Sequence, residues 1–192
     1  MRKLIMKMSM SIDGFVAGPN GEHDWVFRNS DEQSRAWSAA SFNEAGIIIM
    51  GRKSFESMAP YWPTATGPFA APMNTIPKAL FTQKGFKGMP NTAGTPAGAS
   101  WAEARIFHGD LVEGIRELKQ EEGKPIIAIG GAGFVRNLIE TGLIDEYQLA
   151  IHPIMFGAGL PVFTGLSKPL DLKLVDARTF PGGIIANTYR PA

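Results

Sequence analysis

The chain has 192 residues, of which 44% are hydrophobic and 19% are charged, and its 19 Lys and Arg side chains nearly balance 18 Asp and Glu side chains. A chain of this length can bury one sizeable core, so we expect a single domain over residues 1–192. The charge balance is typical of a soluble globular protein and offers no basic surplus for nucleic acid, which we exclude as a partner.

The composition excludes further classes of site. Cysteine is absent, which excludes disulfides, zinc sites built on thiolates and cysteine nucleophiles. The 3 histidines lie far apart and lack metal-binding spacing, so we expect no metal site. No apolar run approaches the roughly 20 residues of a membrane span, and residues 1–7 lack the pattern of a signal peptide. We therefore expect a cytoplasmic protein that does not bind membranes.

Strand and helix patterns alternate along the chain. Apolar and polar residues alternate over residues 3–11, which predicts a first strand, and a turn-rich loop over 14–24 follows it. Short apolar runs at 47–50 and 125–129 are typical of central strands covered on both faces. The other expected elements are helices over 30–44, 110–123 and 134–142, strands over 78–82, 104–107 and 146–155, and a C-terminal hairpin from residue 170 that turns at 181–183.

This order of elements predicts an α/β fold of three layers, in which helices cover both faces of a mostly parallel sheet. The C-terminal strand adds an antiparallel edge. Residues 58–77 and 88–100 are rich in Pro, Ala, Thr and Gly. We interpret both as surface excursions and not as domain linkers, because strand patterns resume directly after each.

Both central strands run directly into glycines, Gly51 in one case and residues 130–131 in the other. Ligands of open α/β sheets bind beyond the carboxyl ends of the strands, where glycine lets the backbone approach a pyrophosphate and the next helix offers free N–H groups. Arg52, Lys53 and Ser54 add two cations and a hydroxyl. Residues 130–133 alone are equally well explained by a tight turn, but together with residues 51–54 they predict a phosphate-binding site.

The chain resembles the dihydrofolate reductase superfamily. Residues 9–17, 50–57, 81–83 and 129–134 are similar to that family's motifs and occur in its order. Residues 142–146 and 153–163 resemble the reductase domains of the riboflavin pathway more than folate enzymes. The resemblance covers nearly the whole chain and implies a dihydrofolate reductase-like fold. An attached zinc deaminase domain is not expected within this chain, because it needs cysteine ligands.

The resemblance also implies an NADPH site. The phosphates would meet Arg52, Lys53 and Ser54, and the planar guanidinium of Arg52 suits the 2′-phosphate. The adenosine would lie along Thr82 and Gln83. The implied cofactor contacts are Ala17, Gly51, Arg52, Lys53, Ser54, Thr82, Gln83, Ile129, Gly130, Gly131, Ala132, Gly133 and Phe134. The alternative for Arg52 and Lys53 is a solvent-exposed helix start.

The implied reaction is hydride transfer from NADPH to a C=N or C=O carbon of a pterin-like, pyrimidine or ribosylamino substrate. In folate reductases a helix carboxylate binds the amidine edge of the substrate. Here residues 33–38 of the expected helix carry no acid, and the nearby acids are Asp31 and Glu32 at its start, with Asp24 earlier. Asp31 is therefore the candidate catalytic and substrate-binding acid, with a helix cap as the alternative. Trp25 is a candidate for contact with the substrate ring, whereas we expect Trp37 in the core.

Because the obvious substrate carboxylate is missing, we favour a riboflavin-reductase-like enzyme that acts on a small heterocycle. The alternatives are a genuine dihydrofolate reductase and a nucleotide-binding protein without catalysis. The resemblance further suggests a homodimer formed through the strand at 147–155 and the loop at 156–159, although core packing explains the apolar residues of that strand equally well.

Overall fold

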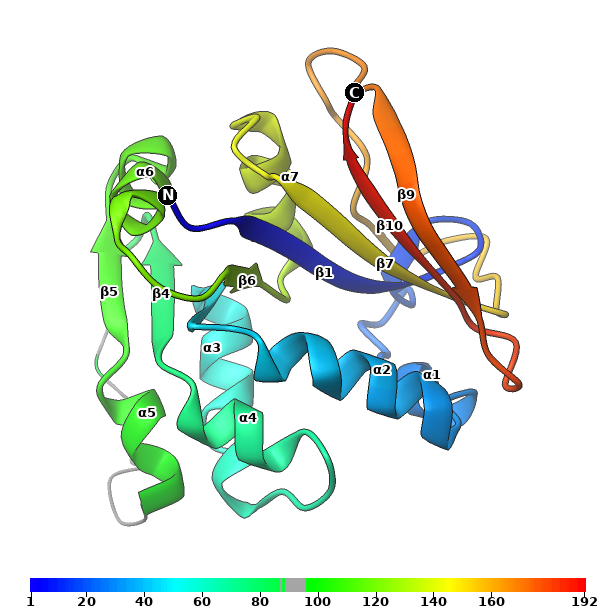
Figure 1. The fold of residues 1–192 in the computed structure, drawn as a ribbon, viewed down its shortest axis with the longest axis horizontal. Coiled ribbons are helices and arrows are strands. Elements are labelled where there is room, and N and C mark those ends of the chain that lie inside the picture. The colour runs from blue at the N-terminus through cyan, green and yellow to red at the C-terminus, as the bar shows by residue number, and fades with distance from the viewer. Residues whose placement is uncertain (87, 89–95) are drawn as a thin grey trace.

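A sheet of 8 strands in the order β5-β4-β3-β6-β1-β7-β10-β9 runs through the computed structural model, which describes residues 1–86, 88 and 96–192 (Figure 1). A short second sheet pairs β2 with β8. The strands are β1 (Leu4–Ser11), β2 (Phe15–Ala17), β3 (Ile47–Gly51), β4 (Lys78–Thr82), β5 (Arg105–His108), β6 (Ile126–Ala128), β7 (Glu146–His152), β8 (Leu160–Pro161), β9 (Leu172–Thr179) and β10 (Ile185–Pro191). The helices are α1 (Trp25–Arg28), α2 (Glu32–Asn43), α3 (Arg52–Met58), α4 (Ala70–Thr75), α5 (Ala99–Ala102), α6 (Leu111–Gln120) and α7 (Ala132–Glu140), with 3-10 turns η1 (Trp62–Thr64) and η2 (Pro96–Gly98).

Strand direction follows the predicted pattern. The strands from β5 to β7 are parallel to their neighbours, and β10 joins β7 in the antiparallel sense. The terminal hairpin of β9 and β10 therefore forms the antiparallel edge. The predicted α/β fold, with a mostly parallel sheet and an antiparallel C-terminal edge, is confirmed.

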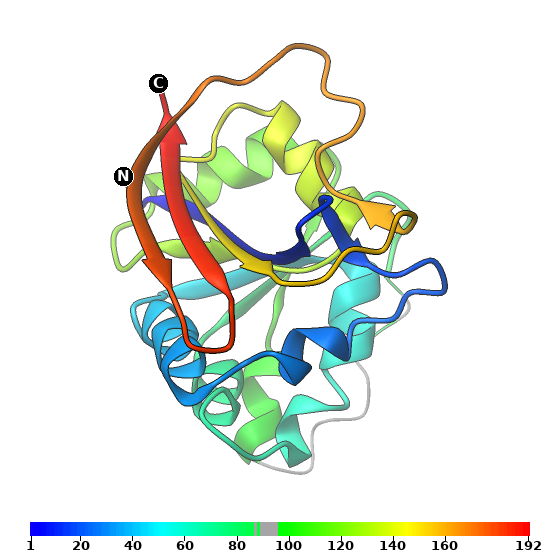
Figure 2. The ribbon, with the colours of Figure 1, turned by 90° about the vertical axis from the view of Figure 1, so that its right-hand side faces the viewer.

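Successive residues of the central strands point to opposite faces of the sheet, as the pleat requires. Ile47 and Ile49 join the core that contains residues of α6 and α7. Ile48 and Met50 join the core that contains residues of α2, α3, α4 and α5. Figure 2 shows the two groups of helices on opposite sides of the sheet. The predicted three layers thus arise because central strands that are apolar on both faces need a helical cover on each.

The structure differs from the sequence prediction in its connections. The loop over 14–24 contains β2, and the excursion over 58–77 contains η1 and α4, whose Met73 is buried. The apolar side chains that contribute to the core are widely spaced in this segment. The Pro and Gly residues between them are typical of a surface loop, which is why the sequence predicts one. The excursion over 88–100 is described only at residue 88 and from residue 96 onward, and residues 89–95 lie outside the described part.

The strand considered for a dimer surface is β7, which ends at His152 and not at residue 155. It lies between β1 and β10, so both of its edges are paired within the chain. Met155 in the following loop is exposed. The edges of this strand are therefore unavailable to a second copy, and a dimer through a face of the strand or through the loop at 156–159 stays a prediction.

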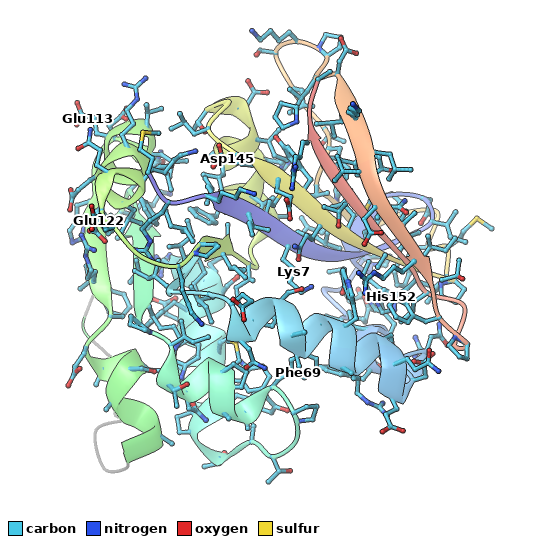
Figure 3. All side chains as sticks on the ribbon, in the orientation of Figure 1. Lys7, Phe69, Glu113, Glu122, Asp145 and His152 are labelled. Carbon is cyan, nitrogen blue, oxygen red and sulfur yellow. The ribbon has the colours of Figure 1, made fainter. Side chains whose placement is uncertain are left out.

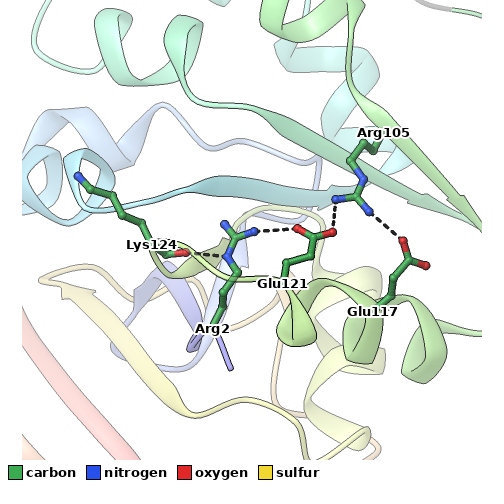
Figure 4. A network of polar contacts seen from close by, with 5 residues as sticks. All are labelled: Arg2, Arg105, Glu117, Glu121 and Lys124. Carbon is green, nitrogen blue, oxygen red and sulfur yellow. Dashed lines mark hydrogen bonds and ion pairs between the residues drawn. The ribbon is translucent and has the colours of Figure 1, made fainter.

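An ion-pair network joins the elements at the amino ends of the parallel strands (Figure 4). Glu121 accepts hydrogen bonds from Arg2 at 3.1 Å and from Arg105 at 2.6 Å, and Arg105 also contacts Glu117 at 2.8 Å. Arg2 donates a further bond to the carbonyl of Lys124 at 2.7 Å. The network fastens α6 to the starts of β1 and β5 and leaves the carboxyl ends of the strands free.

Candidate functional site

A cavity of about 880 Å³ opens beyond the carboxyl ends of β3, β4 and β6. One part, which we call the glycine half, is lined by residues 51–54, 82–84 and 129–134. The other part, the lysine half, is lined by Lys7 and Ser9 of β1, by residues of α1 and α2, and by aromatic side chains such as Phe69. The two halves form one continuous space, so a ligand bound in one half could contact a ligand bound in the other.

Every residue proposed for the cofactor lines this cavity, including Ala17 of β2. Two glycine positions explain how the walls approach so closely. A Cβ on Gly51 would lie 2.7 Å from the Cβ of Phe134, and one on Gly130 would lie 3.0 Å from Ser54 Oγ. Gly130 and Gly131 also have φ of +62° and +75°, which other residues rarely adopt. The glycines therefore bring the starts of α3 and α7 together around one space.

The glycine half offers several groups to an anion. Lys53 and Lys84 line it, and α7 begins there at Ala132 without a side-chain cap on its free N–H groups. Arg52 also lines it, with its guanidinium held by Glu56 at 2.8 and 2.9 Å one helical turn later. That contact orients the guanidinium before any ligand arrives.

An aromatic wall closes the far end of the glycine half. Phe81 and Phe107 stack with ring centroids 4.8 Å apart and an interplanar angle of 8°, and Phe134 stacks on Phe81 at 5.5 Å. Gly114 makes this packing possible, because a Cβ there would lie 2.9 Å from the Phe81 ring. All three rings line the cavity near Gln83. The stacked rings give the cavity an apolar aromatic surface, which suits contact with a heteroaromatic base.

Lys7 is the charged group of the lysine half (Figure 3). It projects from β1 toward α2, with its Nζ 3.3 Å from Ser41 Oγ and 3.8 Å from the centre of the Trp37 ring. The residue is 8% exposed, and burial lowers its pKa from 10.5 to about 7. Among the described residues that line the whole cavity, the only acid is Asp110, which caps α6 beside the glycine half. The lysine half therefore presents a cation that can lose its proton near neutral pH.

Sequence reasoning missed Lys7, because a lysine in an alternating strand looks like a solvent-facing residue. The available signal was its position in the middle of a strand whose neighbours are all apolar or small. Burial of Lys7 depends on α2, whose described face toward the sheet carries Ser34, Ser38 and Ser41 beside Phe42. The sequence does not show that the polar face of α2 covers Lys7, because the two segments become neighbours only in the folded chain.

The structure does not place Asp31 at the cavity. One carboxylate oxygen accepts a hydrogen bond from the Ser34 amide at 2.8 Å, and the other accepts one from the Gly182 amide at 2.6 Å. These bonds lower the pKa of Asp31 below its usual value, the Ser34 amide contributing most. The predicted contact with substrate is thus replaced by the alternative reading, a helix cap that also anchors the C-terminal hairpin.

Trp25 is likewise outside the cavity lining and is fully buried. Its Nε1 donates to the Glu22 carbonyl at 3.0 Å, and its ring meets His152 and Phe156 edge-on. The next residues of α1, Val26 and Phe27, line the cavity instead. The predicted contact between Trp25 and a substrate is therefore not supported, because the first residue of α1 points into the protein interior.

Two further features bear on the class of site. The described residues include no group of three or more His, Asp or Glu side chains that could hold a metal ion. Among the helices in the described ranges, none combines the length and the apolar character needed to cross a membrane.

Comparison with known proteins agrees with this geometry. Residues 2–186 match the family model of the RibD C-terminal domain. The chain belongs to this family. It is 30% identical over 190 residues to the uncharacterized protein YyaP of Bacillus subtilis (strain 168), covering 98% of this chain and 94% of YyaP.

Solved structures share the fold at lower identity. A pyrimidine reductase-like protein from Corynebacterium diphtheriae superposes with a TM-score of 0.69 at 15% identity, covering 100% of this chain and 92% of that protein. Dihydrofolate reductase from Enterococcus faecalis, solved with NADP(H), superposes with a TM-score of 0.61 at 13% identity and covers 98% of this chain and 96% of the enzyme. The dihydrofolate reductase-like fold predicted from the motifs is therefore confirmed.

Proposed function

We propose that this protein of the RibD C-terminal domain family is an NADPH-dependent reductase of a small carbonyl-bearing heterocycle. The observation that carries the proposal is the continuity of one cavity whose glycine half offers cations and free helix amides, and whose lysine half holds the buried Lys7. A dinucleotide and a small ring fit such a division of charge and shape.

The residues of the glycine half fit NADPH. Gly51 and Gly130 leave space that a Cβ would fill, which permits close approach of a pyrophosphate to the backbone. Arg52, Lys53 and Lys84 would hold the phosphates, and the aromatic wall would support the adenine. When bound, the cofactor supplies a hydride, and the protein supplies orientation and exclusion of water.

Lys7 would act on the substrate. As an ammonium it donates hydrogen bonds to a carbonyl or enolate oxygen, and its pKa of about 7 lets it pass a proton to a basic ring atom at neutral pH. The apolar walls from Phe42 and Phe69 would hold a flat ring against it. The N–H donors of an amidine edge need a carboxylate or another acceptor, and this half has no acid among its described residues, so this observation does not favour dihydrofolate reduction.

The cofactor assignment is tested by measuring NADPH and NADH affinities of the native protein and of Arg52→Gln by calorimetry. Loss of a charge-assisted contact to the 2′-phosphate should weaken NADPH binding roughly 10- to 100-fold and leave NADH binding nearly unchanged. Arg28→Gln is the matched control, because Arg28 is exposed and does not line the cavity. If neither nucleotide binds or shifts the melting temperature of the native protein, the reductase proposal is wrong.

Substrate class is tested in NADPH-oxidation assays that compare dihydrofolate with amino- and alkylamino-uracils. Turnover of a uracil with Lys7-dependent kinetics supports the proposal. Efficient turnover of dihydrofolate would instead make the protein a folate reductase that works without the usual helix carboxylate.

A further inference from the structure

A second, smaller cavity of about 70 Å³ lies beside the lysine half and shares lining residues with it. We call it the side chamber. Its shared walls with the large cavity are Ser9, Val26, Phe27, Ser38, Phe69 and Ala150. Its inner end is lined by residues that the large cavity does not reach, among them Trp37, His152 and Ile184. One water needs about 10–15 Å³ of such space, so the chamber has room for several small polar atoms.

The walls of the side chamber carry hydrogen-bonding groups that the fold does not use. Ser9 and Ser38 lie at its junction with the large cavity, and neither hydroxyl has a hydrogen-bond partner among the described residues. By contrast, Ser30 donates to the Val26 carbonyl at 2.6 Å and Ser34 belongs to the cap of α2. The free hydroxyls are therefore the two that a molecule entering from the large cavity would meet first.

His152 lines the same chamber and is 2% exposed. Its Nδ1 is buried without a partner in the described structure, although its ring packs edge-on against Trp25 at 5.1 Å. Most buried polar atoms in native proteins have a partner, because leaving one unpaired is costly. The enclosed Nδ1 cannot meet a group in the chamber, but Nε2 of the same ring is not enclosed and has no hydrogen-bond partner among the described residues, so Nε2 is the atom that can meet one.

The side chamber has one charged lining residue and no acidic one among the described residues. This residue is Arg35, and its guanidinium donates to the Ser30 carbonyl at 2.8 Å on the exposed side of α2. Burial also lowers the pKa of His152 from 6.5 to about 4, which leaves the imidazole uncharged at neutral pH. The guanidinium of Arg35 makes no ion pair with the described residues, but its contact lies on the solvent side, and a sugar phosphate is too large for the space.

We propose that the side chamber binds a short, neutral, hydroxyl-bearing substituent of the substrate, with Ser9 and Ser38 at its mouth and His152 at its inner end. The inference rests on the proposed function for the ring to which the substituent is attached. It narrows the substrate class to a carbonyl-bearing heterocycle that faces Lys7 and carries such a side group without a phosphate.

The chamber is tested first without any ring. Glycerol is titrated into protein labelled at histidine, and the imidazole signals are followed by NMR, with His152 assigned by elimination using His23→Gln and His108→Gln. We expect saturable shifts of the His152 signals and none at His108, with a several-fold weaker response in Ser38→Ala. Ser57→Ala is the control, since Ser57 lines the large cavity but not the chamber. Unchanged His152 signals, or equal shifts at all three histidines, overturn the proposal.

A second measurement adds the ring. Affinities of 6-methyluracil and 6-(hydroxymethyl)uracil for the NADPH-loaded protein should differ about tenfold in favour of the hydroxyl, and Ser38→Ala should remove most of that difference. Equal affinities in the native protein contradict the chamber proposal and leave the reductase proposal intact. If neither uracil binds while glycerol still shifts His152, the chamber is supported and the ring class of the proposed function is wrong.

Discussion

Lys7 is a buried ammonium without a carboxylate partner. Its contacts among the described residues are the Ser41 hydroxyl and the rings of Trp37 and Phe42. An ammonium over an aromatic face gains some attraction, but less than water would give it. The protein therefore gives up stability at this position, which is common where a group serves chemistry.

The change Lys7→Met should stabilise the fold and abolish turnover. Lys7 has a folded-state pKa of about 7 against 10.5 unfolded, so the unfolded chain binds more protons between these values and native stability rises with pH across this window. The variant should gain up to about 4 kcal/mol below pH 7 and lose this advantage toward pH 10.5. Urea unfolding at several pH values and NADPH oxidation measure the two effects.

Lys78 is the comparison residue for Lys7. Burial lowers its pKa to about 7 as well, but it lies against Trp101 and donates to Ser100 Oγ at 3.0 Å, away from the cavity lining. Its replacement by Met should leave kcat unchanged. If Lys7→Met retains native turnover, Lys7 has no role in the reaction.

At the scale of elements, Asp31 joins α2 to the C-terminal hairpin. Its carboxylate caps the helix through Ser34 and also accepts the Gly182 amide from the turn between β9 and β10. A Cβ on Gly182 would lie 2.1 Å from the Asn29 carbonyl oxygen, so the turn packs tightly on the helix start. The cap thus sets the position of α2, which in turn covers Lys7.

The change Asp31→Ala should lower the free energy of unfolding, because α2 loses its N-cap, with NADPH affinity preserved. Asp24→Ala is the control, because Asp24 precedes α1 without making a side-chain cap bond and should change stability by less than about 0.5 kcal/mol. Thermal unfolding and calorimetry measure the two quantities. A fully folded Asp31→Asn variant without turnover would restore the catalytic role that the sequence suggested.

At the scale of the whole molecule, the amino ends of the parallel strands contribute to stability and their carboxyl ends form the candidate site. The amino ends are fastened by the network of Arg2, Glu121 and Arg105, and the carboxyl ends open into the cavity. Arg2 has a side chain that is 7% exposed, so its charge depends on Glu121 more than a surface charge would. Changes in the network should therefore act on stability and not on the site.

The change Glu121→Gln should cost about 1–3 kcal/mol of stability, because it leaves the guanidinium of Arg2 without its charged partner. Glu117→Gln, which removes an exposed ion pair with the same Arg105, should cost at most about 1 kcal/mol. Urea unfolding gives both values, and NADPH affinity should stay the same in both variants. Equal costs would show that burial of Arg2 is irrelevant to the network.

Sequence alone determined the layers and the glycine half of the site. Apolar runs at 47–50 and 125–129 require cover on both faces, and the glycines after them mark strand ends that must meet at one edge of a parallel sheet. These signals are local, because strand period, cap residues and glycine conformation depend on neighbours along the chain.

Only the tertiary structure decided the lysine half. Burial of Lys7, inward rotation of Trp25 and the bond from Gly182 to Asp31 all depend on where α1, α2 and the terminal hairpin pack. Desolvation and hydrogen bonds between residues far apart in the sequence produce no pattern that can be recognised along the chain. From the sequence, Lys7 is therefore expected to be an exposed strand residue and Asp31 a catalytic acid. The glycine half could be predicted from motifs, whereas the lysine half depends on how α2 packs on the sheet.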